Sequence, residues 1–176
     1  MDPNIVRHPA GPVIDTDTGA WGVATASFSA DRFHRFRLSR VWDPNGPRVN
    51  FVMCNPSTAD AFVLDPTVRR CMGYARSWGM GACEVTNIFA LRSTDPAALY
   101  RATDPVGAGN DDAIISAATC ADVVVAAWGT HGALLGRGEE VRNILTPYAP
   151  NILRLTKAGF PSHPLYLPSD ITPTPW

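Results

Sequence analysis

Four short apolar runs, separated by segments with helical spacing, dominate the chain from Val49 onwards. Each run is short enough for a buried strand. The runs cover residues 49–54, 83–90, 122–127 and 151–156. The spacing of apolar residues and the capping signals predict helices at 66–78, 96–100, 110–118 and 139–145. Strands that alternate with helices predict a parallel sheet with helices on both faces.

The chain before Val49 has a different pattern. Residues 24–29 and 33–42 alternate between apolar and polar side chains, which predicts an antiparallel pair of strands at the edge of the sheet. The arginines of the second segment form either a basic strip or a solvated strand face, and the solvated face is the favoured interpretation: Arg35, Arg37 and Arg40.

The expected fold class is therefore α/β. We expect one three-layer α/β/α domain over residues 21–176, with a central four-stranded parallel sheet and the N-terminal strand pair. Residues 1–20 are rich in Pro, Gly, Asp and Thr, which predicts an irregular arm.

Composition narrows the function classes. The 176 residues are enough to bury a core, and 45% hydrophobic with 18% charged residues is an ordinary globular composition. The net charge of −1 gives no global electrostatic case for nucleic acid, so DNA binding needs a local basic patch. No apolar run is long enough to cross a bilayer and no signal peptide opens the chain, so we expect a cytoplasmic protein.

The cysteines do not form a ligand motif. None of the four is spaced as C-x-x-C with another: Cys54, Cys71, Cys83 and Cys120. We expect four buried free thiols, no metal and no cofactor, with an iron–sulfur or zinc site as the minor alternative.

Candidate chemistry gathers where the predicted strands end. Asn55 follows the first strand and precedes a proline, Asn87 lies near the end of the second, and Trp128 follows the third. His163 lies in the proline-rich tail. Parallel strand ends meet at one edge of a sheet, where ligands bind in open α/β folds. These residue types suit hydrolysis in which the leaving group departs as an anion, because an Asn amide can orient a water molecule and a His can donate a hydrogen bond to an anion.

The chain carries no phosphate-binding glycine loop, no G-x-S-x-G elbow and no H-E-x-x-H helix. Instead, four motifs in order resemble the uracil-DNA glycosylase superfamily. They are FVMCNPS (51–57), which resembles the Asn-Pro form of the first motif in the mismatch-specific branch, VTNI (85–88), VVVAAWG (123–129) and SHPL (162–165). The longer string from NPSTAD to HPLYLP is also similar to a bacterial and phage domain of unknown function, which we place as a divergent branch of this superfamily.

The resemblance implies a monofunctional DNA N-glycosylase. Asn55 would activate water, Asn87 would bind the flipped base, His163 would stabilise the departing base, and Leu165 or Tyr166 would fill the gap in the stack. The first motif lacks the acidic residue of the more active branches, so either Asn55 works alone or one of two aspartates assists: Asp60 or Asp65. The remaining candidates are Ser57, Phe62 and Trp128 for the base, and Arg69, Arg70, Lys157 and Ser162 for DNA.

The expected substrate is DNA with a damaged or modified pyrimidine, including a hypermodified phage base, in repair or in defence. No membrane or obligate protein partner is expected. Two other functions stay open: a hydrolase of free nucleotides or RNA bases, and an inactive nucleic-acid-binding module. Several candidates also have a purely structural interpretation. Asn87 can be a buried residue with satisfied hydrogen bonds, Trp128 is better explained as a core residue, and His131 can simply be an exposed residue.

Overall fold

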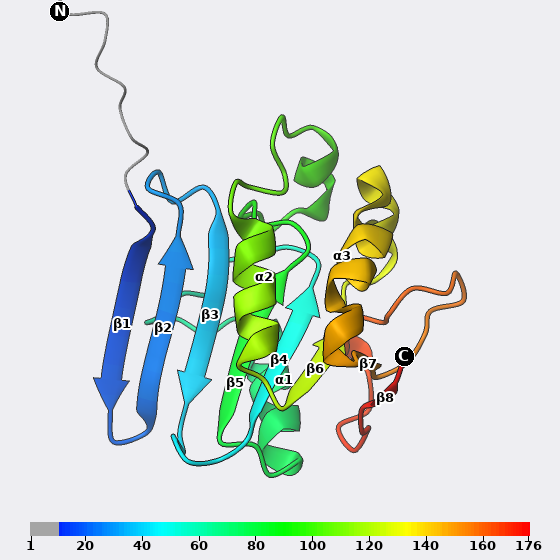
Figure 1. The fold of residues 1–176 in the computed structure, drawn as a ribbon. Helices are drawn as coiled ribbons and strands as arrows, with labels where there is room; N and C mark the ends of the chain where they lie inside the picture. Colours follow the sequence, from blue (N-terminus) through cyan, green and yellow to red (C-terminus); the bar gives the residue numbers. More distant parts are fainter. Residues whose placement is uncertain (1–10) are drawn as a thin grey trace, which may run out of the picture.

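The computed structural model describes residues 11–176, which form one mixed sheet of eight strands flanked by three helices (Figure 1). The strand order is β1-β2-β3-β5-β4-β6-β7-β8. The strands are β1 Val13–Gly19, β2 Gly22–Phe28, β3 Arg35–Val41, β4 Arg48–Met53, β5 Ala82–Asn87, β6 Val123–Ala126, β7 Asn151–Ile152 and β8 Thr174–Pro175. The pairings β5–β4, β4–β6 and β6–β7 are parallel, and the other four are antiparallel.

Helices cover both faces of the sheet, and each face has its own hydrophobic core. Helix α1 (Pro66–Ser77) lies behind the sheet in Figure 1, and α2 (Asn110–Thr119) and α3 (Arg137–Leu145) lie in front of it. Alternate residues of β4 supply the two cores, since Phe51 packs on the α1 side and Val52 on the α2 side. The short 3-10 turns are η1 (Pro96–Tyr100), η2 (Thr130–Gly136), η3 (Thr146–Tyr148) and η4 (Pro164–Tyr166).

The predicted α/β class is confirmed, but the sheet is larger and more antiparallel than predicted. We expected a four-stranded parallel core with an antiparallel strand pair at the edge of the sheet. Strand β3 does extend the sheet by pairing with β5, with Leu38 opposite Val85, but β1 and β8 add two antiparallel strands that were not predicted. The last predicted strand, 151–156, is shorter than predicted, because only Asn151 and Ile152 pair with β6, whereas Leu155 forms an antiparallel bridge with Pro161.

The predicted irregular arm at residues 1–20 is wrong in its second half. Residues 1–10 lie outside the described residues, but Val13–Gly19 forms strand β1, which pairs with β2 from Val13↔Phe28 to Gly19↔Gly22. Asp and Gly are poor strand formers, so the local sequence did not predict this strand. Asp15 is held by an ion pair with Arg32, a contact that local sequence does not predict.

The favoured interpretation of the β3 arginines as a solvated face is wrong for two of the three, since only Arg37 stays partly exposed, where it forms an ion pair with Glu84. Arg35 and Arg40 are buried on the α1 side, where they donate hydrogen bonds to the carbonyls of Ala59 and Asp60. The register of the β2–β3 pair shifts between Ser27 and Phe28, which turns Arg35 to the other side of the sheet from the one that strict alternation along β3 would give it. These hydrogen bonds hold the segment that follows β4 against the sheet.

Candidate functional site

A cleft of about 470 Å³ opens where β4 and β6 end. Four separate segments of the chain line it: residues 54–55 after β4, Pro96 of η1, residues 128–131 after β6, and the C-terminal segment. The C-terminal segment contributes Thr156, His163, Leu165 and Tyr166. The cleft therefore brings together five of the residues that the sequence singled out: Asn55, Trp128, His163, Leu165 and Tyr166.

The Asn55 side chain is fixed by its amide nitrogen. Nδ2 donates to the carbonyl oxygens of Pro56 (3.1 Å) and Ser93 (2.9 Å), and the Ser93 N–H donates back to the Pro56 carbonyl. Both amide protons are therefore used. The amide oxygen Oδ1 accepts no hydrogen bond from another residue of 11–176, so it is the atom that remains for a water or ligand in the cleft.

His163 is held as a neutral donor. It caps η4, where its Nδ1 accepts a hydrogen bond from the Leu165 N–H at 3.3 Å. Burial lowers the pKa of His163, and the nearby Asp65 carboxylate opposes that shift. A neutral ring whose Nδ1 accepts carries its proton on Nε2. The histidine therefore offers an N–H to the cleft near neutral pH.

The His163 loop is attached to α1. The Tyr74 hydroxyl lies 3.3, 3.1 and 2.8 Å from the carbonyl oxygens of Pro164, Leu167 and Pro168, and Arg70 also donates to the Leu167 carbonyl. Arg70 thus has a structural contact, whereas Arg69 is exposed. These bonds hold His163 in place across the sequence gap between α1 and the tail.

The two candidate carboxylates both form turns. Asp65 is the N-cap of α1 and accepts from the Val68 N–H at 2.8 Å, as the Asp-Pro signal predicted. Asp60 accepts from the N–H groups of Phe62 and Val63, both at 2.8 Å. Neither carboxylate lines the cleft, but Asp65 lies close enough to act on His163 electrostatically.

We expect Asp65→Ala to lower the free energy of unfolding by about 1–2 kcal/mol, because it removes the N-cap of α1. Asp65→Asn should retain most of that stability, because an amide oxygen also caps. Urea denaturation of the two variants checks this. Equal stability of Asp65→Ala and wild type would contradict a capping role.

Asn87 does not line the cleft. Its side chain is 0% exposed, and neither Oδ1 nor Nδ2 has a hydrogen-bond partner among the described residues. Cys83 and Val85 pack on the α1 side, so the alternation of β5 puts Asn87 on that side as well. A buried unpaired amide is destabilising by about 1–3 kcal/mol. Asn87 is thus buried, as the structural reading expected, but it is not satisfied.

The other candidates are more dispersed. Trp128 is 1% exposed, in agreement with its core reading, while also forming one wall of the cleft. Tyr166 is 87% exposed at the cleft margin. The four candidates not yet described also lie outside the cleft wall: Ser57, Phe62, Lys157 and Ser162. Among these, Phe62 and Lys157 are exposed and Ser162 is buried.

The cleft also contains residues that sequence reasoning did not select. His131 was expected only to be exposed, yet it lines the cleft and its Nδ1 lies 3.1 Å from the Tyr100 hydroxyl. Pro96 and Thr156 complete the wall. The Gly129 turn after β6 was the available signal for His131, because it aims the following residues over the sheet edge.

The cysteines provide no reactive group in the cleft. Cys54 lines it, but burial raises the pKa of its thiol to about 12. Cys71 and Cys83 are buried as expected, whereas Cys120 is exposed, so the expectation of four buried thiols is wrong at that position. Within residues 11–176, no group of three or more His, Cys, Asp or Glu side chains is arranged to hold a metal ion. The same residues contain no helix long and apolar enough to cross a membrane.

Comparison with protein-family models matches residues 35–165 to a family described as "Protein of unknown function (DUF1643)". The match begins at the buried Arg35 and ends in η4, so it contains every residue that lines the cleft except Tyr166. No curated protein and no solved structure matches the chain.

Proposed function

We propose that this chain, which belongs to the DUF1643 family, is an N-glycosidic hydrolase of the uracil-DNA glycosylase type that removes a base from DNA and leaves an abasic site. One observation carries the proposal. Asn55 and His163, far apart in sequence, line the same cleft with complementary atoms available, an amide oxygen and a ring N–H.

The parallel strands support the same assignment. The segment β5–β4–β6–β7 runs in one direction, and Asn55 follows β4 at its carboxyl end. We propose that this segment corresponds to the central parallel sheet of the superfamily. The antiparallel strands β1–β3 and β8 are then additions to it.

The proposed reaction uses one water. The target base is extruded into the cleft, and Asn55 Oδ1 accepts a hydrogen bond from the water that attacks C1′. A bond forms between the water oxygen and C1′ while the C1′–N bond breaks, and its electron pair leaves with the base. The Nε2 proton of His163 is donated as a hydrogen bond to that anion, and the proton lost by the water ends on the released base.

Exposed residues at the margin of the cleft support contact with DNA. Tyr166 is 87% exposed and Leu165 lines the cleft beside it, so they can fill the gap that an extruded base leaves. Arg69 and Lys157 are exposed cations for phosphate contact. We propose a damaged or modified pyrimidine as the target, in cytoplasmic repair or defence.

The rate of base release should rise with pH and reach its plateau below about 6.5, the ordinary pKa of a histidine. Burial holds the pKa of His163 below its ordinary value, so the ring is neutral above that value. At a pH below that pKa the ring takes up a second proton, on Nδ1. Nδ1 can then no longer accept the hydrogen bond from the Leu165 N–H, so the loop loosens. The same sign applies to stability: the contribution of His163 is complete above about 6.5 and is lost as pH falls.

A pH profile of base release for wild type and His163→Gln tests this. The Gln variant keeps a donor but does not titrate, so its profile should be flat on the acid side at a reduced rate. An acid limb that survives unchanged in His163→Gln would show that another group controls it.

The proposal as a whole is tested by mass spectrometry of bases released from a panel of genomic and phage DNAs, with Asn55→Ala as the comparison. Release by wild type alone supports it. Release only from mononucleotides or RNA would move the activity to the free-nucleotide alternative. Retained DNA binding without release from any substrate would indicate a binding module.

A further inference from the structure

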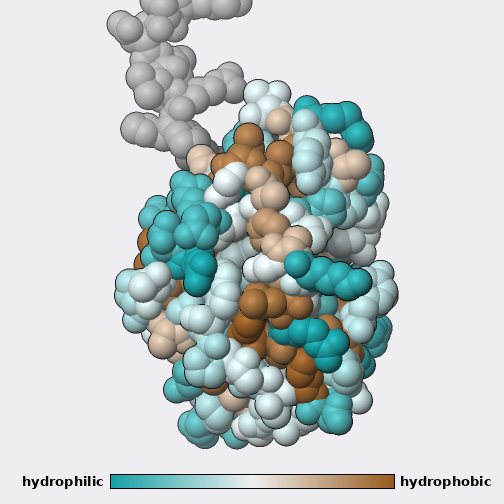
Figure 2. Space-filling view, turned by 90° about the vertical axis from the view of Figure 1, so that its right-hand side faces the viewer, coloured by the Kyte–Doolittle hydropathy of each residue, from teal (hydrophilic) through white to brown (hydrophobic). Residues whose placement is uncertain are grey.

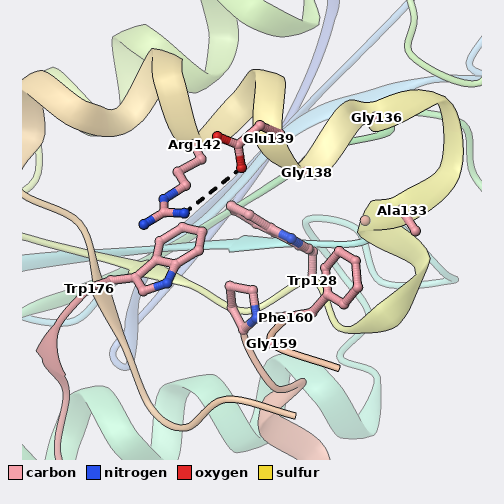
Figure 3. Close-up of a pocket in the computed structure, with 11 residues that line it drawn as sticks. Trp128, Ala133, Gly136, Gly138, Glu139, Arg142, Gly159, Phe160 and Trp176 are labelled. Atoms are coloured by element: carbon pink, nitrogen blue, oxygen red, sulfur yellow. Dashed lines mark ion pairs between the residues drawn. The ribbon is translucent and has the colours of Figure 1, made fainter. Parts of the chain in front are cut away.

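A second cavity of about 290 Å³ lies next to the cleft and shares Trp128 with it. Figure 3 shows three aromatic side chains around this space: Trp128, Phe160 and Trp176. Glycines at 132, 136 and 138 form much of the remaining wall. The sequence analysis did not single out this cavity.

An arginine packs on one of the aromatic rings of this cavity. The Trp176 ring lies 5.4 Å from the Trp128 ring at an interplanar angle of 70°. The Arg142 guanidinium lies 4.4 Å from the centre of the Trp176 ring, and its Nη1 lies 3.9 Å from Glu139 Oε2 (Figure 3). A planar ligand can therefore meet aromatic faces, a guanidinium and a carboxylate in one small space.

Trp128 is a buried part of the cavity wall. Its side chain is 1% exposed, and its Nε1 has no hydrogen-bond partner among the described residues. A Cβ at Gly132 or Gly138 would lie 2.6 or 2.9 Å from this nitrogen, so the two glycines allow their backbones to pack directly against the edge of the indole. Trp128 therefore contributes its ring, and not its N–H, to the wall.

One loop connects the two cavities. Thr156 lines the cleft, while Gly159 and Phe160 line the second cavity. The same loop carries the exposed cations Arg154 and Lys157. Figure 2 faces this side of the molecule and shows hydrophobic side chains gathered near its middle, with hydrophilic side chains between them. A ligand with alternating planar and anionic groups fits such a surface.

We propose that the second cavity binds a nucleobase of single-stranded DNA, from the nucleotide that flanks the extruded base; this rests on the proposed function. Base stacking on aromatic side chains with nearby arginine is the usual way to bind single strands, and it tolerates any base. The volume suits one ring system rather than a folded peptide segment. Lys157, an exposed cation on the loop that lines both cavities, is available to the phosphate of that nucleotide.

The test uses single-stranded oligothymidylate with a stable abasic-site analogue and a fluorescent 2-aminopurine beside it. We expect wild type to bind the probe and quench its fluorescence by stacking. Trp176→Leu should weaken binding by about 5-fold to 100-fold and abolish quenching. Arg142→Gln should weaken binding by a smaller factor.

Arg76→Gln is the matched control, because Arg76 is an exposed guanidinium 4.4 Å from the Trp42 ring, away from both cavities. It should leave affinity and quenching unchanged. Phe160→Leu replaces a second aromatic wall if Trp176→Leu does not fold. Folded variants at both positions with wild-type affinity and quenching would overturn the subsite.

Failure of the subsite can be separated from failure of the proposed function. Base release from a substrate that lacks the flanking nucleotide should be equal in wild type and Trp176→Leu. If wild type releases no base from any substrate, the hydrolase proposal fails, and the proposal of a subsite beside an extruded base fails with it. If release is normal and the 2-aminopurine signal does not respond to the variants, only the subsite fails.

Discussion

Asn55→Ala is expected to reduce the rate of base release by about 100-fold to 10,000-fold with the fold preserved. The amide oxygen is the atom proposed to orient the attacking water, and none of the described residues that line the cleft carries a carboxylate that could replace it. Asp60 and Asp65 are both occupied in turns. Because Asn55 Nδ2 makes two hydrogen bonds to carbonyls, the variant should also lose about 1–2 kcal/mol of stability.

Asn151→Ala is the matched control. Asn151 Nδ2 also lies near two backbone carbonyl oxygens, those of Val124 (3.4 Å) and Ala149 (3.3 Å), but at the start of β7, outside the cleft. We expect a modest loss of stability and unchanged base release. Single-turnover base release and thermal unfolding of both variants separate the two effects. A rate for Asn55→Ala within about tenfold of wild type would remove Asn55 from the reaction centre.

The helices that the sequence predicted best have local signals at both ends. Helix α1 begins at Pro66 after its N-cap Asp65 and ends at Ser77 before its C-cap Trp78, which is followed by Gly79 with φ of +75°. Each of these signals acts within one turn. The pairing of β3 with β5 is different, because it joins residues distant in sequence. No local pattern distinguishes an edge strand pair from three strands that extend the main sheet.

The site divides in the same way. The convergence of Asn55 and Trp128 follows from parallel strands ending at one edge, so the order of elements was enough to predict it. His163 joins them through a loop that Tyr74 of α1 holds in place, a contact that the order of elements does not predict. The burial of Arg35 was not predictable, because it depends on the segment after β4 folding over β3 and on a bulge that alters side-chain facing. Burial lowers the pKa of Arg35 to about 10, against the opposing field of Asp65. The only hydrogen-bond acceptor of its guanidinium among the described residues is the backbone carbonyl of Ala59.

Asn87→Leu is expected to stabilise the protein while abolishing base release. The Asn87 amide is 0% exposed and lacks partners on both atoms, so its replacement by an apolar side chain of similar size should raise the free energy of unfolding by about 1–3 kcal/mol. A residue whose removal stabilises the fold is retained for another reason, and base recognition supplies one. The proposed role also requires motion, because a base can reach Asn87 only when the residues covering it move.

Asn110→Leu gives the opposite sign and serves as the control. Asn110 is equally buried, but its Nδ2 donates to the carbonyls of Asn87 (2.9 Å) and Ile88 (3.2 Å). Its replacement leaves those carbonyls without that donor, so we expect a loss of about 1–3 kcal/mol. Urea denaturation measures both variants. If Asn87→Leu destabilises as Asn110→Leu does, Asn87 is a structural residue and the base must be read elsewhere. If it stabilises and base release is unchanged, Asn87 does not read the base.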